Sequence, residues 1–315
     1  MRILFVKTSS LGDVIHHCPA VSDARRSFPD ASIDWVVEES FAGIAEMHPG
    51  IRSVIPVGIR RWRKRVTSRS VWSEIVEFRR AIRAQVYDFV IDTQGLLKSA
   101  LIASQARGVA HGFDASSARE PIASRFYDVR HRVAREQHAV DRNRALSAAA
   151  LGSQPDAKCD YGLVAQTENP LPVRSPFCVL LSMTSRSDKL WPEERWVELV
   201  RALASEGKES VMPWGSEAEQ ARCRRITESA GSGIVPRSLS LGELASVISA
   251  SSAVVGVDTG LSHLAAAFGV PVVGVFCGSD PRLTGLLGCG RIMNLGGPGK
   301  IPAIEEALAA VRALT

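Results

Sequence analysis

The chain has 315 residues, of which 45% are hydrophobic and 23% are charged, with 38 Lys and Arg against 33 Asp and Glu. This ordinary composition excludes a disordered, collagenous or coiled-coil chain. At about 150 residues per domain, the length predicts two domains, each large enough to bury its own core. The apolar runs have the length of strands and fall far short of the ~20 residues that a membrane span needs.

The net charge of +5 is unevenly distributed along the chain. Residues 1–150 contain 23 Lys and Arg and 16 Asp and Glu, a balance of +7, whereas residues 151–315 contain 15 and 17, a balance of −2. The N-terminal half is therefore the candidate for binding an anionic partner. Composition alone leaves nucleic acid, a phosphorylated lipid and an anionic sugar as alternatives.

The sequence gives no sign of export. Lys7 and Asp13 interrupt the apolar segment that a signal peptide needs, and no small-residue cleavage site follows. The six cysteines are scattered without a C-x-x-C pair, a spacing that favours reduced, buried thiols over a zinc site or disulfides. We therefore expect the mature chain to begin near Met1 and to stay in the cytosol.

Short apolar runs alternate with longer amphipathic stretches from the N-terminus onward. In the first half, strands are predicted at Ile3–Val6, Ile33–Val37 and Phe89–Asp92, and helices at Val14–Arg26 and Val71–Ala84. This alternation of strand and helix is typical of a parallel, doubly wound α/β sheet that is covered by helices.

The pattern lapses between residues 151 and 176, where prolines and polar residues predict a linker. We place the two domains at residues 1–165 and 166–315, with the alternative that the last helix packs back on the first domain. In the second half the predicted strands are Phe177–Leu181, Ser210–Met212, Ala253–Val257 and Val272–Phe276, and the predicted helices are Pro192–Glu206, Leu241–Ala250, Leu261–Phe268 and Ile301–Leu314. Because ligands of such sheets bind beyond the carboxyl ends of strands, we expect the site in a cleft between the two domains.

The first polar constellation follows the first predicted strand and reads Lys7-Thr8-Ser9-Ser10-Leu11-Gly12-Asp13. Its serines and the amides that follow can bind an anion or a sugar at a helix N-terminus. Asp13 is either a helix cap or a general base that accepts a proton from an attacking hydroxyl. The loop lacks G-x-G-x-x-G, so it does not carry the dinucleotide fingerprint of a Rossmann oxidoreductase.

A second constellation, Val257-Asp258-Thr259-Gly260-Leu261-Ser262-His263, also joins a predicted strand to a helix. The glycine lets the backbone approach a ligand closely, and the amides at the helix start suit a diphosphate. His263 is either a further donor to these phosphates or a structural histidine.

Two more loops follow predicted strands. In Met183–Pro192, Lys189 can neutralise a leaving phosphate while Thr184 and Ser185 supply hydroxyl groups, although a solvated loop would have the same composition. In Pro213–Glu219, one carboxylate suits a ribose diol, as acidic residues do in nucleotide sites, or is simply a charge on a helix face.

The run Arg60-Arg61-Trp62-Arg63-Lys64-Arg65 indicates an anion-binding surface or a solvated face. Its tryptophan suits base stacking or a membrane interface. Gly299-Lys300 lacks the upstream glycine and the Ser or Thr of a P-loop, and no H-E-x-x-H or H-x-H metal pattern occurs.

Together these motifs resemble the ADP-heptose:LPS heptosyltransferase family over nearly the whole chain. The matching segments are Met1–Asp13, Asp34–Glu39, Val54–Val57 with Arg60–Lys64, Gln94–Leu96 with Lys98-Ser99, Ala118–Pro121, Gln137–Val140, Lys189 with Trp191–Glu194, Pro213–Gly215 and Asp258–His263. The last motif marks the family broadly. The arginine run and A-R-E-P are more particular to the member that adds the first heptose than to the sister enzyme that adds the second.

The resemblance implies a GT-B fold, in which two Rossmann-like doubly wound domains face each other across a cleft. It implies that the N-terminal domain binds the acceptor and that the C-terminal domain binds the nucleotide-sugar. The implied reaction moves L-glycero-D-manno-heptose from ADP-heptose to the 5-position of the first Kdo of Kdo2-lipid A, with inversion and without a cofactor or metal. The alternatives are transfer of the second heptose, or a non-catalytic protein that binds nucleotides or polyanions.

The family's functional positions are carried over residue by residue. Asp13 matches the catalytic base, and Lys189 joins it as the cation that eases departure of the diphosphate. Donor-binding positions match Thr184, Ser185, Lys189, Glu219, Leu239, Asp258, Thr259, Gly260 and His263, with leucine at 239 where relatives have methionine beside the adenine. Acceptor-side positions match Lys7, Ser10, Arg60, Arg61, Arg63, Lys64 and Arg119.

The expected partners are ADP-heptose and Kdo2-lipid A, with no nucleic acid. Because the sequence has no D-x-D motif to hold a metal, the pre-aimed donors of the phosphate site are expected to take over its role. The basic face is expected to rest peripherally on the anionic inner leaflet of the inner membrane, on its cytoplasmic side.

Overall fold

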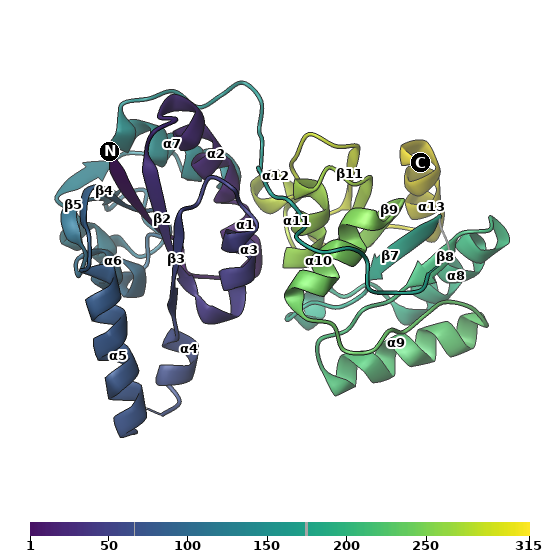
Figure 1. Cartoon of the computed structure of the whole chain (residues 1–315). Coiled ribbons are helices and arrows are strands. Elements are labelled where there is room, and N and C mark those ends of the chain that lie inside the picture. Colours follow the sequence, from purple (N-terminus) through teal and green to yellow (C-terminus); the bar gives the residue numbers. More distant parts are fainter. Residues whose placement is uncertain (66, 174–175) are drawn as a thin grey trace. The chain divides into compact units, whose positions relative to one another are not determined.

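The computed structural model describes residues 1–65, 67–173 and 176–315. In it the chain forms two compact units, Met1–Leu163 and Val164–Thr315, and each unit contains its own parallel sheet with helices packed on it (Figure 1). The division falls two residues before the domain boundary that the sequence predicts. Residues 152–173 contain no helix or strand, and residues 174 and 175 of the predicted linker lie outside the described residues.

The first sheet has the strand order β3-β2-β1-β4-β5-β6, and all of its neighbouring strands are parallel. This is the strand order of the Rossmann sheet. Successive strands are added on one side of β1 up to β3 and then on its other side from β4 onward, so the order reverses between β1 and β4. The strands are β1 Arg2–Val6, β2 Ser32–Glu38, β3 Ser53–Val57, β4 Val86–Asp92, β5 Arg107–Phe113 and β6 Val129–His131. In the register of the central strands, Phe5 lies opposite Trp35 on one side and Ile91 on the other.

The helices of the first unit bury their apolar sides on this sheet. They are α1 Leu11–Ile15, α2 Cys18–Ser27, α3 Ala42–Glu46, α4 Ile59–Trp62, α5 Arg69–Ile82, α6 Leu97–Ala103 and α7 Ala139–Leu151, with 3-10 turns η1 Glu39–Phe41 and η2 Pro121–Phe126. Phe78 and Ile82 of α5 pack with Leu4, Val36 and Val90 in one core cluster.

The prediction of one helix over Val14–Arg26 is wrong, because α1 ends at Ile15 and α2 begins at Cys18. Pro19 explains the break. Proline has no backbone N–H, so the hydrogen bond that residue 19 would donate to the carbonyl of Ile15 in a continuous helix cannot form. The proline instead occupies the first turn of α2, where its missing N–H costs nothing.

The second sheet has the order β11-β10-β9-β7-β8, again with parallel neighbours. This is the flavodoxin-like strand order. The side on which successive strands are added changes between β7 and β9. The elements are β7 Phe177–Leu181, η3 Ser187–Lys189, α8 Glu193–Ser205, β8 Glu209–Val211, α9 Glu217–Ala230, α10 Leu241–Ala250, β9 Ala253–Val257, α11 Gly260–Ala267, β10 Val272–Phe276, α12 Pro281–Thr284, β11 Ile292–Gly296 and α13 Ile304–Leu314.

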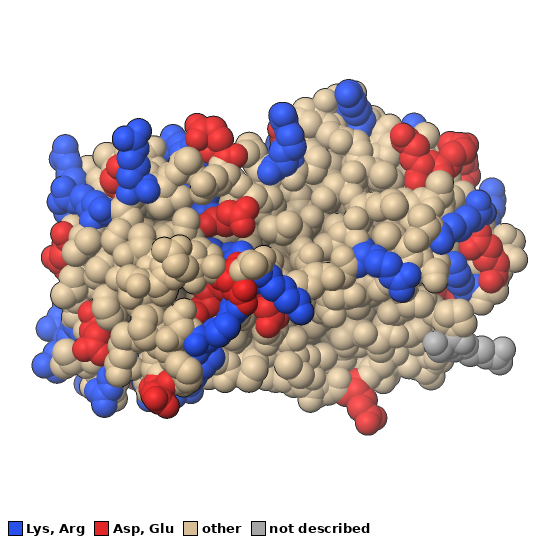
Figure 2. All heavy atoms as spheres, turned by 90° about the horizontal axis from the view of Figure 1, so that it is seen from above, with Lys and Arg blue, Asp and Glu red and all other residues tan. Residues whose placement is uncertain are grey.

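Strands β7, β9 and β10 are buried along their whole length, which explains why they read as unbroken apolar runs in the sequence. The last helix, α13, packs against α8 and against β9, β10 and β11 of the same unit. Within residues 1–65, 67–173 and 176–315, no helix is both long and apolar enough to cross a membrane. On the face drawn in Figure 2, basic and acidic side chains are intermixed.

A buried ion pair joins α2 to α7. The guanidinium of Arg144 donates to Asp23 through Nε at 2.7 Å and through Nη2 at 3.1 Å, and both side chains are less than one tenth exposed. The same Nη2 donates to the carbonyl of Asp156 at 2.6 Å, so the pair also fixes the chain that follows α7.

We expect Arg144→Met to lower the free energy of unfolding of the first unit by about 3–5 kcal/mol, because it leaves the Asp23 carboxylate buried without its main partner. Denaturant titration followed by a probe in this unit measures the change. Arg107→Met, at an exposed position of β5, is the control and should stay within about 0.5 kcal/mol of the parent. Equal effects of the two substitutions on the free energy of unfolding would contradict a stabilising role of the buried Arg144–Asp23 pair.

Candidate active site

The first polar cluster lies where β1 and β4 end, at the point where the strand order of the first sheet reverses. Gln94, after β4, holds the loop after β1: its Oε1 accepts the amide N–H groups of Thr8 at 3.0 Å and Ser9 at 3.1 Å, and its Nε2 donates to the carbonyl of Ser9 at 2.5 Å. All three residues are buried. The loop is therefore fixed to two neighbouring strands by side-chain hydrogen bonds.

Asp92, the last residue of β4, supports this arrangement from inside the unit. It is fully buried and accepts the amide N–H of Gln94 at 2.8 Å and the Tyr127 hydroxyl at 2.7 Å. Burial raises the pKa of Asp92, and these hydrogen bonds oppose the rise. The tyrosine ring lies against Gly112, where an added Cβ would come within 2.3 Å of it, so only glycine fits there.

Asp13 lies in the first turn of α1, as predicted. Its Oδ2 accepts the amide N–H of Ser10 at 2.9 Å and the Ser10 hydroxyl at 3.3 Å, and Arg119 Nη1 lies 3.5 Å away. The carboxylate therefore caps the helix, yet one quarter of its side-chain surface remains exposed. Capping and a role in chemistry, which the sequence posed as alternatives, are compatible in this geometry.

Two lysines lie beside this loop in different environments. Lys7 is 5% exposed, and its Nζ donates to the carbonyl of Thr93 at 2.9 Å and to Asn143 Oδ1 at 3.3 Å. Burial lowers the pKa of Lys7 to about 8, although the charge of Asp13 opposes this. The predicted acceptor residue Lys7 is thus a support inside the unit rather than part of its surface.

Lys98, in the first turn of α6, also belongs to this cluster. It was not among the site residues predicted from the sequence. Its Nζ donates to the Ser9 hydroxyl at 2.8 Å. Burial lowers the pKa of Lys98, while the nearby charges of Glu38 and Asp13 raise it. The available signal was the family motif in which Lys98-Ser99 stands, because a single lysine at a helix start is otherwise unremarkable in sequence.

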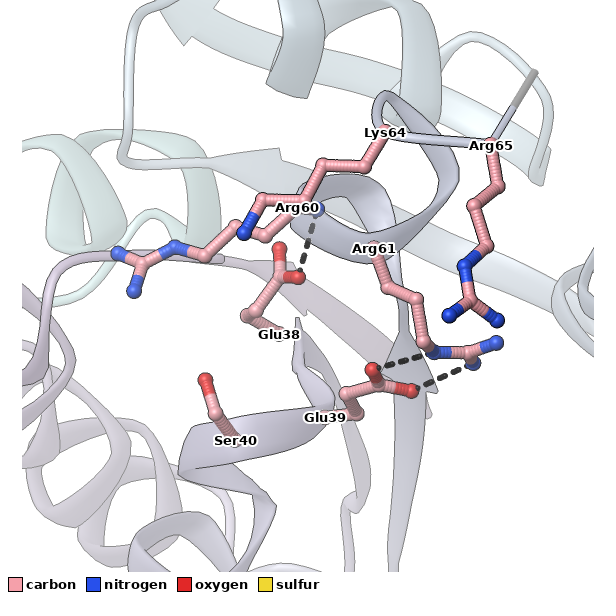
Figure 3. A pocket seen from close by; sticks show the side chains of 7 residues that line it. All are labelled: Glu38, Glu39, Ser40, Arg60, Arg61, Lys64 and Arg65. Atoms are coloured by element: carbon pink, nitrogen blue, oxygen red, sulfur yellow. Dashed lines mark hydrogen bonds and ion pairs between the residues drawn. The ribbon is translucent and has the colours of Figure 1, made fainter.

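The basic run forms α4 and the turn after it. A pocket of about 410 Å³ is lined by four of its cations and three residues that follow β2 or end it: Arg60, Arg61, Lys64, Arg65, Glu38, Glu39 and Ser40 (Figure 3). Glu38 is buried and accepts the amide N–H of Arg60 at 2.9 Å. Burial raises the pKa of Glu38, and the hydrogen bond from Arg60 opposes the rise. In Figure 3 the side chains of Arg60 and Lys64 extend away from the pair that Arg61 forms with Glu39.

Arg61 is already engaged by two carboxylates. Its guanidinium donates to Glu39 through Nη2 at 2.9 Å and to Glu74 of α5 through Nη1 at 2.8 Å. Trp62 Nε1 donates to the same Glu74 at 2.7 Å, and its ring packs edge-on against Phe78 with 5.9 Å between centroids. Both residues therefore join α4 to its neighbours, and the tryptophan side chain is half-buried. All five cations of the run are exposed, and among the described residues Arg61 is the one that pairs with carboxylates, those of Glu39 and Glu74.

The second polar cluster lies at the reversal point of the second sheet, after β7 and β9. Asp258 is its centre: its Oδ2 accepts Lys189 Nζ at 2.6 Å and the Ser279 hydroxyl at 2.5 Å, and His263 Nε2 lies 3.8 Å from Oδ1. The Thr184 hydroxyl donates to the backbone carbonyl of Asp258 at 3.0 Å, which ties the two loops together. Ser279, after β10, was not predicted.

The environment of Asp258 sets its charge. Burial by itself raises the pKa of this carboxyl, but hydrogen bonds from His263, Lys189 and Ser279 and the lysine charge outweigh it and hold the pKa well below its usual range. Thr259 and Gly260 follow directly and form the N-cap and first residue of α11. The amides of Thr259 and Gly260, at the start of this helix, thus lie close in the chain to an aspartate that is paired with a lysine.

The remaining predicted donor residues surround the same edge of the sheet. Glu219 lies in the first turn of α9, where its Oε2 accepts the amide N–H of Gly215 at 2.7 Å. Leu239 is half-buried directly before Ser240, the N-cap of α10, and Ser185 is exposed in the loop after β7. Among the described residues, no group of three His, Cys, Asp or Glu side chains is placed to hold a metal ion.

Two Rossmann-like units, one with a capped carboxylate among cations and one with a lysine beside a helix N-terminus, define a two-unit α/β protein suited to a phosphorylated ligand. The chain belongs to glycosyltransferase family 9 (heptosyltransferase), whose sequence pattern matches residues 75–303. It is therefore a glycosyltransferase, and the expected enzyme class is confirmed.

Individual relatives agree with the family. The chain is 46% identical over 288 residues to lipopolysaccharide heptosyltransferase 1 of Escherichia coli strain K12, and the aligned region covers 90% of each chain. Solved structures of E. coli heptosyltransferase WaaC are 42% identical: the one with ADP has a TM-score of 0.92 and covers 100% of both chains. The one with ADP-2-deoxy-2-fluoro heptose has a TM-score of 0.87 and covers 99% of this chain and 98% of that one.

E. coli ADP-heptose lps heptosyltransferase II is similar in fold, with a TM-score of 0.78 at 20% identity, covering 100% of this chain and 98% of that chain. The similarity to these heptosyltransferase structures confirms the GT-B fold class predicted from the sequence.

We expect Asp258→Asn to reduce the stability of the second unit at neutral pH and to have less effect in acid. The native pKa of this carboxyl is lowered, so its stabilising contribution is complete above the ordinary aspartate pKa of about 4 and is lost as pH falls through the native value. Urea unfolding at several pH values measures the difference between parent and variant. In the control Asp280→Asn, which removes the ion pair with the exposed Arg282 and keeps a side-chain oxygen at the N-cap of α12, a small difference is expected at every pH. A parent–variant difference for Asp258 that grew in acid would contradict this account.

Proposed function

We propose that this protein transfers L-glycero-D-manno-heptose from ADP-heptose to the first Kdo of Kdo2-lipid A, with inversion and without a metal ion. The observation that carries the proposal is the 46% identity over 90% of both chains to a heptosyltransferase 1. The WaaC structures with ADP and with ADP-2-deoxy-2-fluoro heptose support ADP-heptose as the donor. The much lower identity of 20% to heptosyltransferase II favours the first heptose over the second.

In the proposed donor site, the ADP diphosphate binds at the start of α11. Lys189 and the amides of Thr259 and Gly260 bind the phosphates, with His263 as a further donor. As the bond from the anomeric carbon to the diphosphate oxygen breaks, its electron pair moves to that oxygen, and these groups stabilise the growing charge. Thr184 and Ser185 donate hydroxyl hydrogen bonds, and Asp258 orients Lys189.

The nucleoside is assigned to residues farther along the same edge. Glu219 accepts hydrogen bonds from the ribose hydroxyls, as carboxylates do in other nucleotide sites. Leu239 provides an apolar surface for the adenine. Both are half-buried at the first turn of a helix or directly before one, where they are accessible to a ligand.

Asp13 is the proposed general base. Its carboxylate accepts the proton of the attacking Kdo hydroxyl while the new bond to the anomeric carbon forms. Ser10 and Arg119, which lie within 3.5 Å of the carboxylate, hold it in place. A diphosphate leaves readily as an anion, so the mechanism needs one base and no acid on the far side of the sugar.

The anionic groups of the acceptor are assigned to the cations of the first unit. Arg60, Arg63, Lys64 and Arg119 are exposed and bind carboxylate or phosphate, and Lys98, whose Nζ lies 2.8 Å from the Ser9 hydroxyl, joins them. Lys7 and Arg61 act as positioning residues, since their hydrogen bonds are made within the unit. A lipid acceptor of this kind would place the protein peripherally on the inner face of the inner membrane.

Mass spectrometry of the product tests the function directly. Purified protein incubated with ADP-heptose and Kdo2-lipid A in excess EDTA should give an acceptor heavier by one heptose. Acceptor that already carries the first heptose should react poorly. Preference for that acceptor would favour the second-heptose alternative, loss of activity in EDTA would contradict the metal-free phosphate site, and polyanion binding without product would favour the non-catalytic alternative.

Asp13→Asn should lower kcat by roughly 10²–10⁴ with ADP-heptose affinity nearly unchanged, because a base acts on the barrier and not on donor binding. Initial rates and donor titration by calorimetry separate the two effects. Asp30→Asn, at an exposed position of the same unit, is the control and should keep full activity.

A substitution in the second unit is expected to have a different effect from Asp13→Asn. Lys189→Ala should weaken ADP-heptose binding as well as the rate, because its ammonium contacts the phosphates before and during reaction. Residual activity of Asp13→Asn close to that of the parent would overturn its assignment as base.

A further inference from the structure

The outer side of α5 carries a stripe of arginines around two exposed apolar side chains. Trp72 is 58% exposed and Val76 is 52% exposed, and both face solvent although the opposite side of the helix is buried. At 100° per residue, these two fall within an arc of about 100° together with four exposed arginines. The arginines are Arg69, Arg79, Arg80 and Arg83.

The charges of this stripe are not neutralised locally. None of its four arginines pairs with a carboxylate of residues 1–65, 67–173 or 176–315. The acidic residues of the helix, Glu74 and Glu77, lie outside the arc, and Glu74 is bound by Arg61. The stripe therefore differs from the face drawn in Figure 2, where basic and acidic side chains are intermixed.

We propose that this side of α5, defined by Arg69, Trp72, Val76, Arg79, Arg80 and Arg83, docks on the surface of an anionic lipid bilayer. Helices that lie in the membrane interface combine an aromatic and aliphatic strip with flanking basic residues. Tryptophan partitions to the level of the headgroups, and the long arginine side chains reach lipid phosphates on either side of it.

The choice of a bilayer over another polyanion follows from the apolar centre of the stripe. A nucleic-acid surface would use the arginines but would leave Val76 without a partner, whereas a bilayer accommodates both. The choice also rests on the proposed function, because the proposed acceptor is a lipid. In Figure 1, α5 runs beside α4, and Glu74 of α5 binds Arg61 of α4, so the docked helix belongs to the part of the unit that also holds the proposed acceptor cations.

Vesicle flotation with the full-length protein tests the proposal. We expect binding to vesicles of phosphatidylethanolamine and phosphatidylglycerol, little binding to phosphatidylcholine vesicles, and release at high salt because the attraction is screened. Brominated acyl chains in the anionic vesicles should quench tryptophan fluorescence in the parent, and less so in Trp72→Phe. Binding to both vesicle types alike, or equal quenching of the two proteins, would overturn the proposal.

Substitutions in the stripe have matched controls in the second unit. Arg79→Ser with Arg80→Ser should weaken binding to anionic vesicles about fivefold for each arginine removed. Serine substitution of both Arg224 and Arg291, which are exposed, removes the same charge and should leave binding unchanged. Val76→Ser should weaken binding more than Ile301→Ser does, because Ile301 is equally exposed, at 52%, but lies in the second unit. Equal losses in variant and control would overturn the proposal, as would tighter binding to duplex DNA than to vesicles.

The proposed function is tested separately with the same variants. On an acceptor without acyl chains and in the absence of membranes, the stripe variants should transfer heptose at the parental rate, because none of the altered residues is assigned to the reaction. Inactivity of the parent there would count against the proposed function alone, while parental vesicle binding by all stripe variants would count against docking alone.

Discussion

Parallel strand direction is the constraint on which both candidate sites depend. In a parallel sheet, every strand ends at the same edge, and a ligand can enter that edge only where the strand order reverses and neighbouring connections diverge. Each unit has one such point, between β1 and β4 and between β7 and β9. The loop of Asp13 lies at the first, and the loops of Lys189 and Asp258 lie at the second. Side chains distant in sequence are brought together there without any dedicated scaffold.

The fold was largely predictable because burial on both faces leaves a strong signal. Strands such as β9 and β10 are buried throughout and read as unbroken apolar runs. The edge strand β6 is mostly exposed, and β5 contains two glycines, so neither has such a signal. The break between α1 and α2 was missed because the amphipathic pattern continues across Pro19, although proline removes the hydrogen bond that would join the helices.

The sequence was sufficient to predict which loops carry the site residues, but it did not predict which side chains those residues contact. The loops that hold Asp13, Lys189 and Asp258 were found because polar residues follow apolar strands. No sequence pattern showed that Lys7 is buried, that Arg61 is bound by Glu39 and Glu74, or that Ser279 reaches Asp258. These are contacts between segments far apart in the chain, and they depend on side-chain packing that local spacing does not record.

The ion pair between Lys189 and Asp258 also affects which anions can occupy the second unit. The ammonium of Lys189 has a counter-ion 2.6 Å away in Asp258, so much of its charge is balanced within the unit. A small cellular anion such as inorganic phosphate gains little from a cation that is already satisfied. The proposed donor, with two phosphates, a sugar and a base, would make enough additional contacts to share the lysine, so we expect the pair to disfavour abundant simple anions.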